Sequence, residues 1–400
     1  MWSYVKRSGA ALESRTAQAH SARCRLVAHL AAGRTTDLAP EVLRLPARLY
    51  TDPERWRTEV RALFEETPLV ACLTRDVASP GDRLLLEVAG QSVIVLRDAD
   101  GQVRAFRNRC AHRAAKLAGP DVPLRGGRHI ICPFHGWSYD LAGNLSAVPG
   151  RAGFDPQTLA GCRLSPVAAG EQDGIVFVRL RGSGPLDLPG HLGSLAPAVA
   201  GLELAGLEFV QRSRLESAAN WKTVIDTYAE NYHFGALHGK SLGGAFPANV
   251  AAFDDHSPHW ILTFPDDTLA ALASVPEEEW PDARHAATYF IFPNTILVAG
   301  DLGAGERFAR MFRIFPGASP GEVTSLFSVH TEGVAPEAYR DRFGGITDSE
   351  SDVTREDYAV AEGIWSNLAA GDDADLLAGR NEPAIQAFHR AVFKATGMPA

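Results

Sequence analysis

The stretch Cys110-Ala-His112, followed after nineteen residues by Cys132-Pro-Phe-His135-Gly-Trp137, is the most informative part of this chain. Its two cysteines and two histidines form two short pairs, C-x-H and C-x-x-H. With 5 Cys and 13 His in 400 residues, each pair is expected only about 0.16 times by chance. Two such pairs within one short segment therefore indicate a metal-binding site.

Two thiolates on one iron and two neutral imidazoles on the other are the ligand set of a histidine-ligated 2Fe–2S cluster. A structural zinc site also takes two Cys and two His, but it more often pairs like with like. Here each pair mixes sulfur and nitrogen, which suits a cluster held by two facing loops. Strand-like sequence runs into both pairs, through Val103 to Phe106 and through Ile130-Ile131.

Residues 70 to 165 resemble a Rieske domain, in which Cys110, His112, Cys132 and His135 would hold one 2Fe–2S cluster. The gap between the pairs is longer than is usual in that family. We therefore expect Pro120 to Arg128 to form an extended surface loop.

Bulk properties exclude several classes of protein. The formal charge of −9 and a pI near 5.8 disfavour nucleic acid and anionic membranes as partners. No apolar run approaches the roughly 18 residues of a membrane span. The three further cysteines do not form a disulfide framework, so we expect plain thiols in a reducing compartment and predict a cytoplasmic protein. They are Cys24, Cys72 and Cys162.

The first 45 residues are rich in Ala, Ser and Arg and poor in acids. A transit peptide has this composition, but so does a disordered or weakly helical extension, which we favour. We predict four parts: an N-terminal extension (1–45), a helix that packs on the catalytic domain (46–66), a 2Fe–2S domain (67–168) and a catalytic domain (169–400). The helix should open at Thr51-Asp52-Pro53.

A second candidate site begins after residue 215, where the pattern becomes helical. Asp226, Glu230 and His233 lie at i, i+4 and i+7, on one face of an ideal helix. His238 lies five residues further, which is about 140° around a helix from His233, so both reach one ion only if the helix ends or bulges at Gly235. The H-x-x-x-x-H spacing alone is expected about 0.4 times by chance, and histidines also favour helix C-termini.

Asn220-Trp221-Lys222, together with Glu230, His233 and His238, resembles the catalytic domain of Rieske non-haem iron oxygenase large subunits. The resemblance implies one mononuclear Fe(II) held by His233, His238 and a late carboxylate, for which we choose Asp357. Thr354 and Asp357 also form a T-x-x-D start, so Asp357 is alternatively a helix-capping residue. Glu356 and Asp352 are the competing ligands.

In this family the residue at Glu230 is a bridge between subunits. It would link His135 of one subunit to His233 of the next, which requires a closed ring of copies, most plausibly a homotrimer. Most relatives carry Asp here, and Glu resembles the subgroup that oxidises quaternary ammonium compounds such as carnitine and betaines. Thr227 stands where many members have Asn.

The resemblance implies an α+β protein: an all-β Rieske domain plus a helix-on-antiparallel-sheet (helix-grip, START-like) catalytic domain. It also implies a terminal oxygenase that uses O₂ to hydroxylate or demethylate a small organic substrate, such as a quaternary amine. A separate NAD(P)H-dependent reductase, with or without a ferredoxin, would supply electrons, because the chain has no G-x-G-x-x-G turn of its own. The alternatives are an aromatic-ring dioxygenase and a non-catalytic electron carrier.

Overall fold

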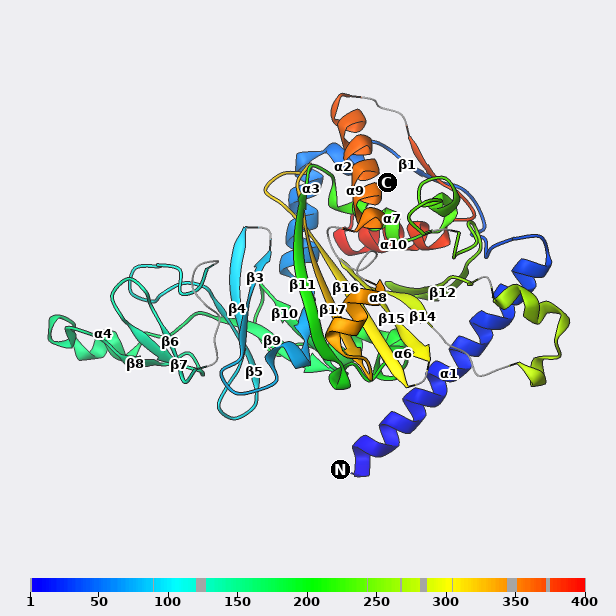
Figure 1. The fold of residues 1–400 in the computed structure, drawn as a ribbon. Coiled ribbons are helices and arrows are strands. Elements are labelled where there is room, and N and C mark those ends of the chain that lie inside the picture. Colours follow the sequence, from blue (N-terminus) through cyan, green and yellow to red (C-terminus); the bar gives the residue numbers. More distant parts are fainter. Residues whose placement is uncertain are drawn as a thin grey trace. The chain divides into compact units, whose positions relative to one another are not determined.

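The computed structural model describes residues 2–88, 90–119, 127–242, 244–266, 268–280, 286–303, 305–343, 351–371 and 375–399, and the account of side chains begins at residue 17. The chain divides into two compact units (Figure 1). The smaller unit is Phe64–His191, and the larger unit combines Met1–Leu63 with Leu192–Ala400. None of the described helices has both the length and the apolarity needed to cross a bilayer.

The smaller unit is built from antiparallel strands in two sheets. The first has the order β2-β10-β9-β5-β4-β3 and the second β6-β7-β8. Side chains of β3 alternate between half-buried and buried, as expected for a strand with one face on a core. The strands are β2 (Leu69–Leu73), β3 (Arg83–Val88), β4 (Gln91–Arg97), β5 (Val103–Arg107), β6 (His129–Ile131), β7 (Ser138–Asp140), β8 (Leu145–Ala147), β9 (Pro166–Gln172) and β10 (Ile175–Arg179), with a short helix α4 (Pro156–Ala160).

The larger unit is built on a seven-stranded antiparallel sheet in the order β11-β17-β16-β15-β14-β13-β12. β14 and β15 form a hairpin, because the chain turns at Phe292 to Asn294. The strands are β11 (Glu208–Ser217), β12 (Ala252–His256), β13 (His259–Thr263), β14 (Ala286–Ile291), β15 (Thr295–Gly303), β16 (Glu306–Pro316) and β17 (Val323–Glu332).

Helices pack against this sheet and position the candidate site. α7 (Trp221–Tyr228) contacts β16 and α9 (Asp352–Ala369), and α10 (Pro383–Thr396) contacts β12 and β13. α8 (Pro336–Phe343) contacts β11, and a two-stranded sheet joins β1 (Leu43–Leu45) to β18 (Leu376–Ala378). The predicted class, an all-β domain plus helices on an antiparallel sheet, is confirmed.

The predicted helix after Asp52 is present as α3 (Pro53–Glu59), preceded by the short α2 (Arg48–Thr51). The Asp52 carboxylate accepts from the backbone N–H of Glu54 at 2.8 Å and so caps α3. At the other end, Glu59 is fully buried and its Oε2 accepts from Lys222 Nζ at 2.5 Å and Trp221 Nε1 at 3.2 Å. This buried ion pair ties α3 to the start of α7.

The N-terminal segment differs from the disordered extension that we expected. Helix α1 (Trp2–Ala31) occupies most of it, and α1 contacts β12, α6 (Ala196–Ala200) and a 3₁₀ segment, η7 (Leu269–Ser274). Ala22 and Leu26 are buried in one cluster with Val250 and Ala252. The apolar face of α1 is narrow, so its partners, which lie far along the chain, decide its order rather than its own composition.

The boundary between the domains also differs from the predicted one at residue 168. β10 pairs with β2 on one side and with β9 on the other. Cutting the chain after residue 168 would therefore split β9 and remove β10, which joins β2 to the rest of the sheet, and the smaller unit continues to His191. The expected loop at 120–128 lies mostly outside the described residues.

Candidate active site

Two loops of the smaller unit carry the four predicted cluster ligands, Cys110, His112, Cys132 and His135. The first loop follows β5 and the second joins β6 to β7. Asn108 fixes the first loop: its Oδ1 accepts from the backbone N–H groups of Leu117 and Ala118, each at 2.9 Å. The second loop is closed by a hydrogen bond at 2.8 Å from the backbone N–H of Cys132 to the carbonyl of Trp137.

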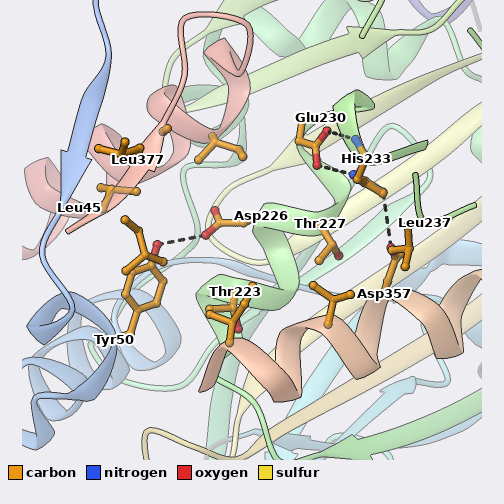
Figure 2. Close-up of a pocket in the computed structure, with 15 residues that line it drawn as sticks. Leu45, Tyr50, Thr223, Asp226, Thr227, Glu230, His233, Leu237, Asp357 and Leu377 are labelled. Atoms are coloured by element: carbon orange, nitrogen blue, oxygen red, sulfur yellow. Dashed lines mark hydrogen bonds and ion pairs between the residues drawn. The ribbon is translucent and has the colours of Figure 1, made fainter. Parts of the chain in front are cut away.

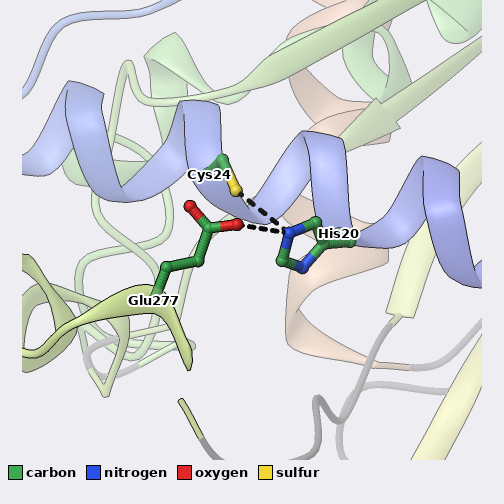
Figure 3. Close-up of side chains that lie close together, drawn as sticks. All are labelled: His20, Cys24 and Glu277. Atoms are coloured by element: carbon green, nitrogen blue, oxygen red, sulfur yellow. Dashed lines mark hydrogen bonds and ion pairs between the residues drawn. The ribbon is translucent and has the colours of Figure 1, made fainter. Parts of the chain in front are cut away.

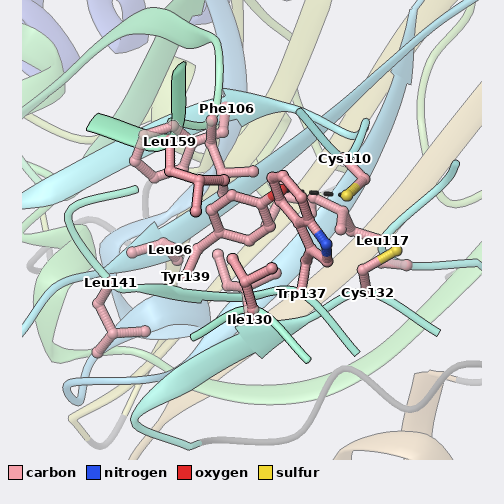
Figure 4. Packing of buried hydrophobic residues seen from close by; sticks show 14 residues of the cluster. Leu96, Phe106, Cys110, Leu117, Ile130, Cys132, Trp137, Tyr139, Leu141 and Leu159 are labelled. Atoms are coloured by element: carbon pink, nitrogen blue, oxygen red, sulfur yellow. Dashed lines mark hydrogen bonds between the residues drawn. The ribbon is translucent and has the colours of Figure 1, made fainter. Parts of the chain in front are cut away.

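The ligand side chains of the two loops converge. Both cysteines are buried in the apolar cluster drawn in Figure 4, beside Trp137 and Tyr139. The His112 and His135 rings lie 4.8 Å apart between centroids, and Trp137 stacks on His112 at 4.7 Å. Burial and a hydrogen bond with Cys110 raise the pKa of Tyr139, so its hydroxyl stays protonated. That hydroxyl lies 3.1 Å from the Cys110 sulfur, to which it would donate when the sulfur is a thiolate ligand of the cluster.

The four ligands are arranged for a cluster rather than for one ion. A single zinc ion needs its ligand atoms close together around one centre. Among the described residues, the groups that bring three ligand atoms within 4.8 Å of one another lie elsewhere in the chain. Two buried sulfurs on this pair of loops, together with two adjacent imidazoles, suit a 2Fe–2S unit, whose irons are held by sulfur on one side and nitrogen on the other.

The second site begins where α7 ends. We expected one helix to continue through His233, but α7 stops at Tyr228 and a 3₁₀ turn, η6 (Tyr232–Gly235), follows. The Glu230 carboxylate accepts from the backbone N–H groups of Tyr232 and His233 and opens this turn. The helix therefore ends before Glu230 and not at Gly235. The new chain direction brings His233 and His238 together, with ring centroids 5.0 Å apart.

His233, His238 and Asp357 form one cluster, with a ligand atom of each within 4.8 Å of the others. Figure 2 shows two of the three, His233 and Asp357, where they line the cavity. Asp357 Oδ1 lies 2.9 Å from His238 Nε2 and 3.5 Å from His233 Nε2. Asp357 is buried in α9, whose cap is Ser351, so the capping alternative is wrong. Burial raises the pKa of this carboxyl, although its hydrogen bond with His238 opposes the shift.

This cluster fits a metal ion. His233 Nε2 is buried and has no hydrogen-bond partner, although it points to the carboxylate of Asp357. A buried polar atom without a partner is costly, and a cation between these groups would satisfy it. Two imidazoles and one carboxylate are the facial set of non-haem iron sites.

Each imidazole also pairs, through its Nδ1, with a carboxylate on the side of the ring away from Asp357. Glu230 Oε1 pairs with His233 Nδ1, and Glu356 Oε2 lies 2.7 Å from His238 Nδ1. Because an ionised carboxylate can only accept, each Nδ1 carries a proton and each Nε2 is left to face the centre. Burial opposes charge on His238, but hydrogen bonds with Asp357 and Glu356 outweigh it and raise the pKa of this histidine.

The two residues that competed with Asp357 as the third ligand, Glu356 and Asp352, lie outside the centre of this cluster. Glu356 contacts His238 on the side away from the centre and also accepts from Ser241 Oγ at 2.6 Å. Asp352 is exposed at the start of α9, 3.8 Å from Arg355. The role of Glu356 behind His238 was missed by our reading of the sequence, because only the fold brings residues 238 and 356 together.

A cavity of about 270 Å³ adjoins the cluster. Three carboxylates line it, and its wall contains Tyr50 and aliphatic side chains but, among the described residues, no Lys or Arg. Asp226 accepts from the Tyr50 hydroxyl at 3.2 Å and lies 3.0 Å from His389 Nε2, so it turns away from the Glu230 side. The lining residues are Leu45, Tyr50, Thr223, Asp226, Thr227, Glu230, His233, Leu237, Asp357, Val360, Ile364, Leu376, Leu377, Ala378 and Ile385.

Comparison with protein families agrees with both sites. A model of the Rieske [2Fe-2S] domain matches residues 67–160, and a model of the ring hydroxylating alpha subunit (catalytic domain) matches residues 204–397. The chain belongs to the Rieske non-haem iron oxygenase alpha subunits. The smaller unit of this chain is therefore its 2Fe–2S domain, and the larger unit contains the family's catalytic domain, which binds mononuclear iron.

Curated relatives of this chain include enzymes of two kinds, monooxygenases and a dioxygenase. The chain is 31% identical over 199 residues to the glycine betaine monooxygenase oxygenase subunit of Chromohalobacter salexigens, covering 50% of this chain and 44% of the relative. It is 30% identical over 204 residues to the carnitine monooxygenase oxygenase subunit of Escherichia coli K12, covering 50% and 53%. The large subunit of anthranilate 1,2-dioxygenase from Acinetobacter baylyi is 30% identical over 207 residues, covering 49% and 43%. The chain thus spans about half the length of the curated relatives it matches.

Solved structures agree over more of the chain. A quaternary ammonium Rieske monooxygenase in complex with L-carnitine has a TM-score of 0.74 at 19% identity, covering 89% of this chain and 97% of the other. Naphthalene 1,2-dioxygenase with bound indole has a TM-score of 0.70 at 18% identity, covering 88% and 92%. These likenesses show a shared fold.

Proposed function

We propose that this chain is the terminal oxygenase component of a multicomponent Rieske system, which uses O₂ to hydroxylate or demethylate a small organic substrate. The observation that carries the proposal is the convergence of His233, His238 and Asp357 beside a cavity. An iron ion held by two imidazoles and a carboxylate leaves positions open for O₂ and supplies the oxidising chemistry. Electrons would come from NAD(P)H through a separate reductase, with or without a ferredoxin.

The protein's own groups prepare this chemistry. Glu230 and Glu356 fix the tautomers of His233 and His238, so that each ring offers its Nε2 to the metal. Asp357 supplies the third ligand from a helix interior, where its position is set by packing. The aliphatic wall of the cavity limits water at the reacting centre.

We assign Glu230 the further role of a bridge between copies of the chain. Its carboxylate already holds His233 Nδ1, and 12% of its side chain remains exposed. Next to it, Tyr232, Val360 and Leu377 are large apolar side chains that face solvent. Ile131 and Phe134 are similarly exposed beside His135 of the smaller unit. Such patches mark interaction surfaces, and a head-to-tail ring, which we propose to be a homotrimer, would cover both.

Electron transfer gives a direct test of the bridge. Glu230→Gln should keep both metal centres and still accept electrons at the cluster, but the reduced cluster should be reoxidised far more slowly when substrate and O₂ are added. Glu230→Asp should recover part of the rate. Rapid mixing with visible detection measures both, and reoxidation of Glu230→Gln at the wild-type rate would falsify the bridge.

For the substrate we propose a quaternary ammonium compound. Asp226, Glu230 and Asp357 are among the residues that line the cavity, no Lys or Arg is among its described lining residues, and Tyr50 adds an aromatic ring; this negative, partly aromatic lining favours a cation over a neutral ring. The relatives that act on glycine betaine and carnitine support the same class. The second candidate is dioxygenation of an aromatic ring, which the anthranilate dioxygenase relative supports.

A matched pair of compounds separates these candidates. O₂ uptake with a surrogate reductase should be stimulated by a trimethylammonium compound and not by its carbon isostere, in which a tert-butyl group replaces the cation. Stimulation by both, or by anthranilate alone, would favour the second candidate. A non-catalytic carrier would show neither response and would hold about two iron atoms per chain, against about three for the oxygenase.

A further inference from the structure

A second cluster of metal-ligating side chains lies on the N-terminal helix, outside the active site. His20 and Cys24 are four residues apart on α1, and Glu277 faces them from the short 3₁₀ turn η8 (Glu277–Glu279) (Figure 3). One ligand atom of each lies within 4.8 Å of the other two. The mononuclear iron site uses other residues, and no role in oxygenation requires these three.

The geometry points to a zinc-binding site formed by His20, Cys24 and Glu277. Helical i, i+4 spacing places the imidazole and the thiol on one face of α1, one turn apart. Cys24 Sγ lies 3.7 Å from His20 Nε2, and Glu277 Oε1 lies 2.7 Å from the same nitrogen. Small rotations of three side chains would place all three atoms about 2.0–2.3 Å from one ion.

The donor set selects the type of metal. One sulfur, one nitrogen and one oxygen suit a borderline-soft ion such as Zn²⁺, whereas Mg²⁺ and Ca²⁺ prefer oxygen alone. Three protein ligands leave the fourth tetrahedral position for water. On binding, the Cys24 thiol gives up its proton to solvent and its sulfur bonds to the metal.

Both ligand-bearing segments are held in place without a metal. Arg25 pairs with Asp37 and Asp254, each at 2.6 Å, and so fixes the α1 backbone beside β12. On the other side, Trp280 Nε1 donates to the carbonyl of Val275 at 3.0 Å. The site is therefore largely formed before the ion arrives, which lowers the cost of binding.

Zinc here would clamp α1 to the segment that contains η7 and η8. At least half of each side chain is exposed, 50% for His20 and 58% for Glu277, so their hydrogen bond alone contributes little. A metal that joins the two segments contributes its binding free energy to the folded state.

The rate at which Cys24 is alkylated reports specifically on zinc binding at this site. The full chain, with its iron centres loaded, is incubated with iodoacetamide with and without Zn²⁺, and the modified cysteines are identified by peptide mass spectrometry. Saturating zinc should slow the modification of Cys24 by more than about tenfold, because the metal-bound thiolate is blocked. Cys162 is similarly half-buried and has no His or Glu beside it among its described contacts, so its rate should stay unchanged.

Variants identify the other two ligands. His20→Ala and Glu277→Gln should each weaken the protection of Cys24 by more than about tenfold in zinc concentration. Glu278→Gln, the neighbouring exposed carboxylate, is the matched control and should behave as wild type. The proposal is overturned if zinc protects Cys24 and Cys162 equally, if it protects neither, or if the two ligand variants keep wild-type protection. Zinc that displaces iron at the active site would leave this readout unchanged, because that site contains no cysteine.

Discussion

Removing Glu356 should loosen the mononuclear iron without disturbing the 2Fe–2S cluster. Glu356 accepts from His238 Nδ1 at 2.7 Å and from Ser241 Oγ at 2.6 Å, so it holds the ring in the tautomer that presents Nε2. Loss of such a partner behind a ligating histidine costs about 10–100-fold in metal affinity, or roughly 1.4–2.7 kcal/mol at 1.36 kcal/mol per tenfold.

Two substitutions of Glu356 should weaken iron binding to different extents. Glu356→Gln keeps an uncharged acceptor for Nδ1–H and should lie near the tenfold end of that range. Glu356→Ala leaves the ring without an acceptor and should lie near the hundredfold end. Glu362→Gln is the control on the same helix. Glu362 accepts from Ser217 Oγ at 2.7 Å and does not belong to the group of ligand residues around the mononuclear iron site.

Iron retention against increasing chelator measures the effect, and the visible absorption of the cluster serves as the internal standard. We expect the variants to fall from about three towards about two iron atoms per chain at lower chelator concentration than wild type. Unchanged retention in Glu356→Ala would refute the argument. Loss of the cluster in the same titration would show a general loss of structure instead.

Three further predictions concern stability and the cluster. Lys222→Met removes one of two cations that pair with the buried carboxylate of Glu59, the other being Arg55, whose Nε lies 3.3 Å from Oε1. The free energy of unfolding should therefore fall by at most about 3–5 kcal/mol, as measured by denaturant titration; a loss below about 1 kcal/mol would contradict a stabilising role of the Lys222–Glu59 pair. A hydrogen bond with Arg97 lowers the pKa of Glu171, so this pair stabilises the fold above the unfolded pKa and ceases to do so as the pH falls through the folded one. Glu171→Gln should therefore cost at most about 1 kcal/mol at pH 7, since the side chain is partly exposed, and the difference from wild type should vanish in acid. Tyr139→Phe removes a donor to a cluster sulfur and should lower the reduction potential; a redox titration that shows no change would contradict this.

Local signals predicted the parts of the fold that depend on neighbouring residues. Asp52 and Pro53 predicted the start of α3, and a carboxylate at that position does cap the helix. Leu84, Leu86 and Val88 are the buried positions of β3 and alternate with half-buried ones, a period-2 pattern that can be read from the sequence alone. The mixed Cys/His pairs likewise predicted two loops, because a spacing of one or two residues between ligands leaves little room for any other structure.

Features that depend on distant residues were not predictable from pattern. The end of α7 at Tyr228 is set by the Glu230 carboxylate, which captures two backbone N–H groups that a continuing helix would have used. Helical periodicity in the sequence does not show that a side-chain carboxylate will compete with the helix for these backbone N–H groups. The domain boundary depends on β10 pairing with β2 across about a hundred residues, and the order of α1 depends on partners on β12.

His233 and His238 differ in exposure in a way that bears on electron entry. Glu356 reaches His238 from a separate helix, and although the Glu356 side chain is 31% exposed, the His238 side chain is only 1% exposed. Glu230 is only three residues from His233, and the His233 side chain remains 19% exposed beside a carboxylate that is 12% exposed. An imidazole that is itself partly exposed can be reached from outside without opening the core. The His233 side is therefore the side from which we expect an electron to arrive, and the His238 side is the one that keeps the metal bound.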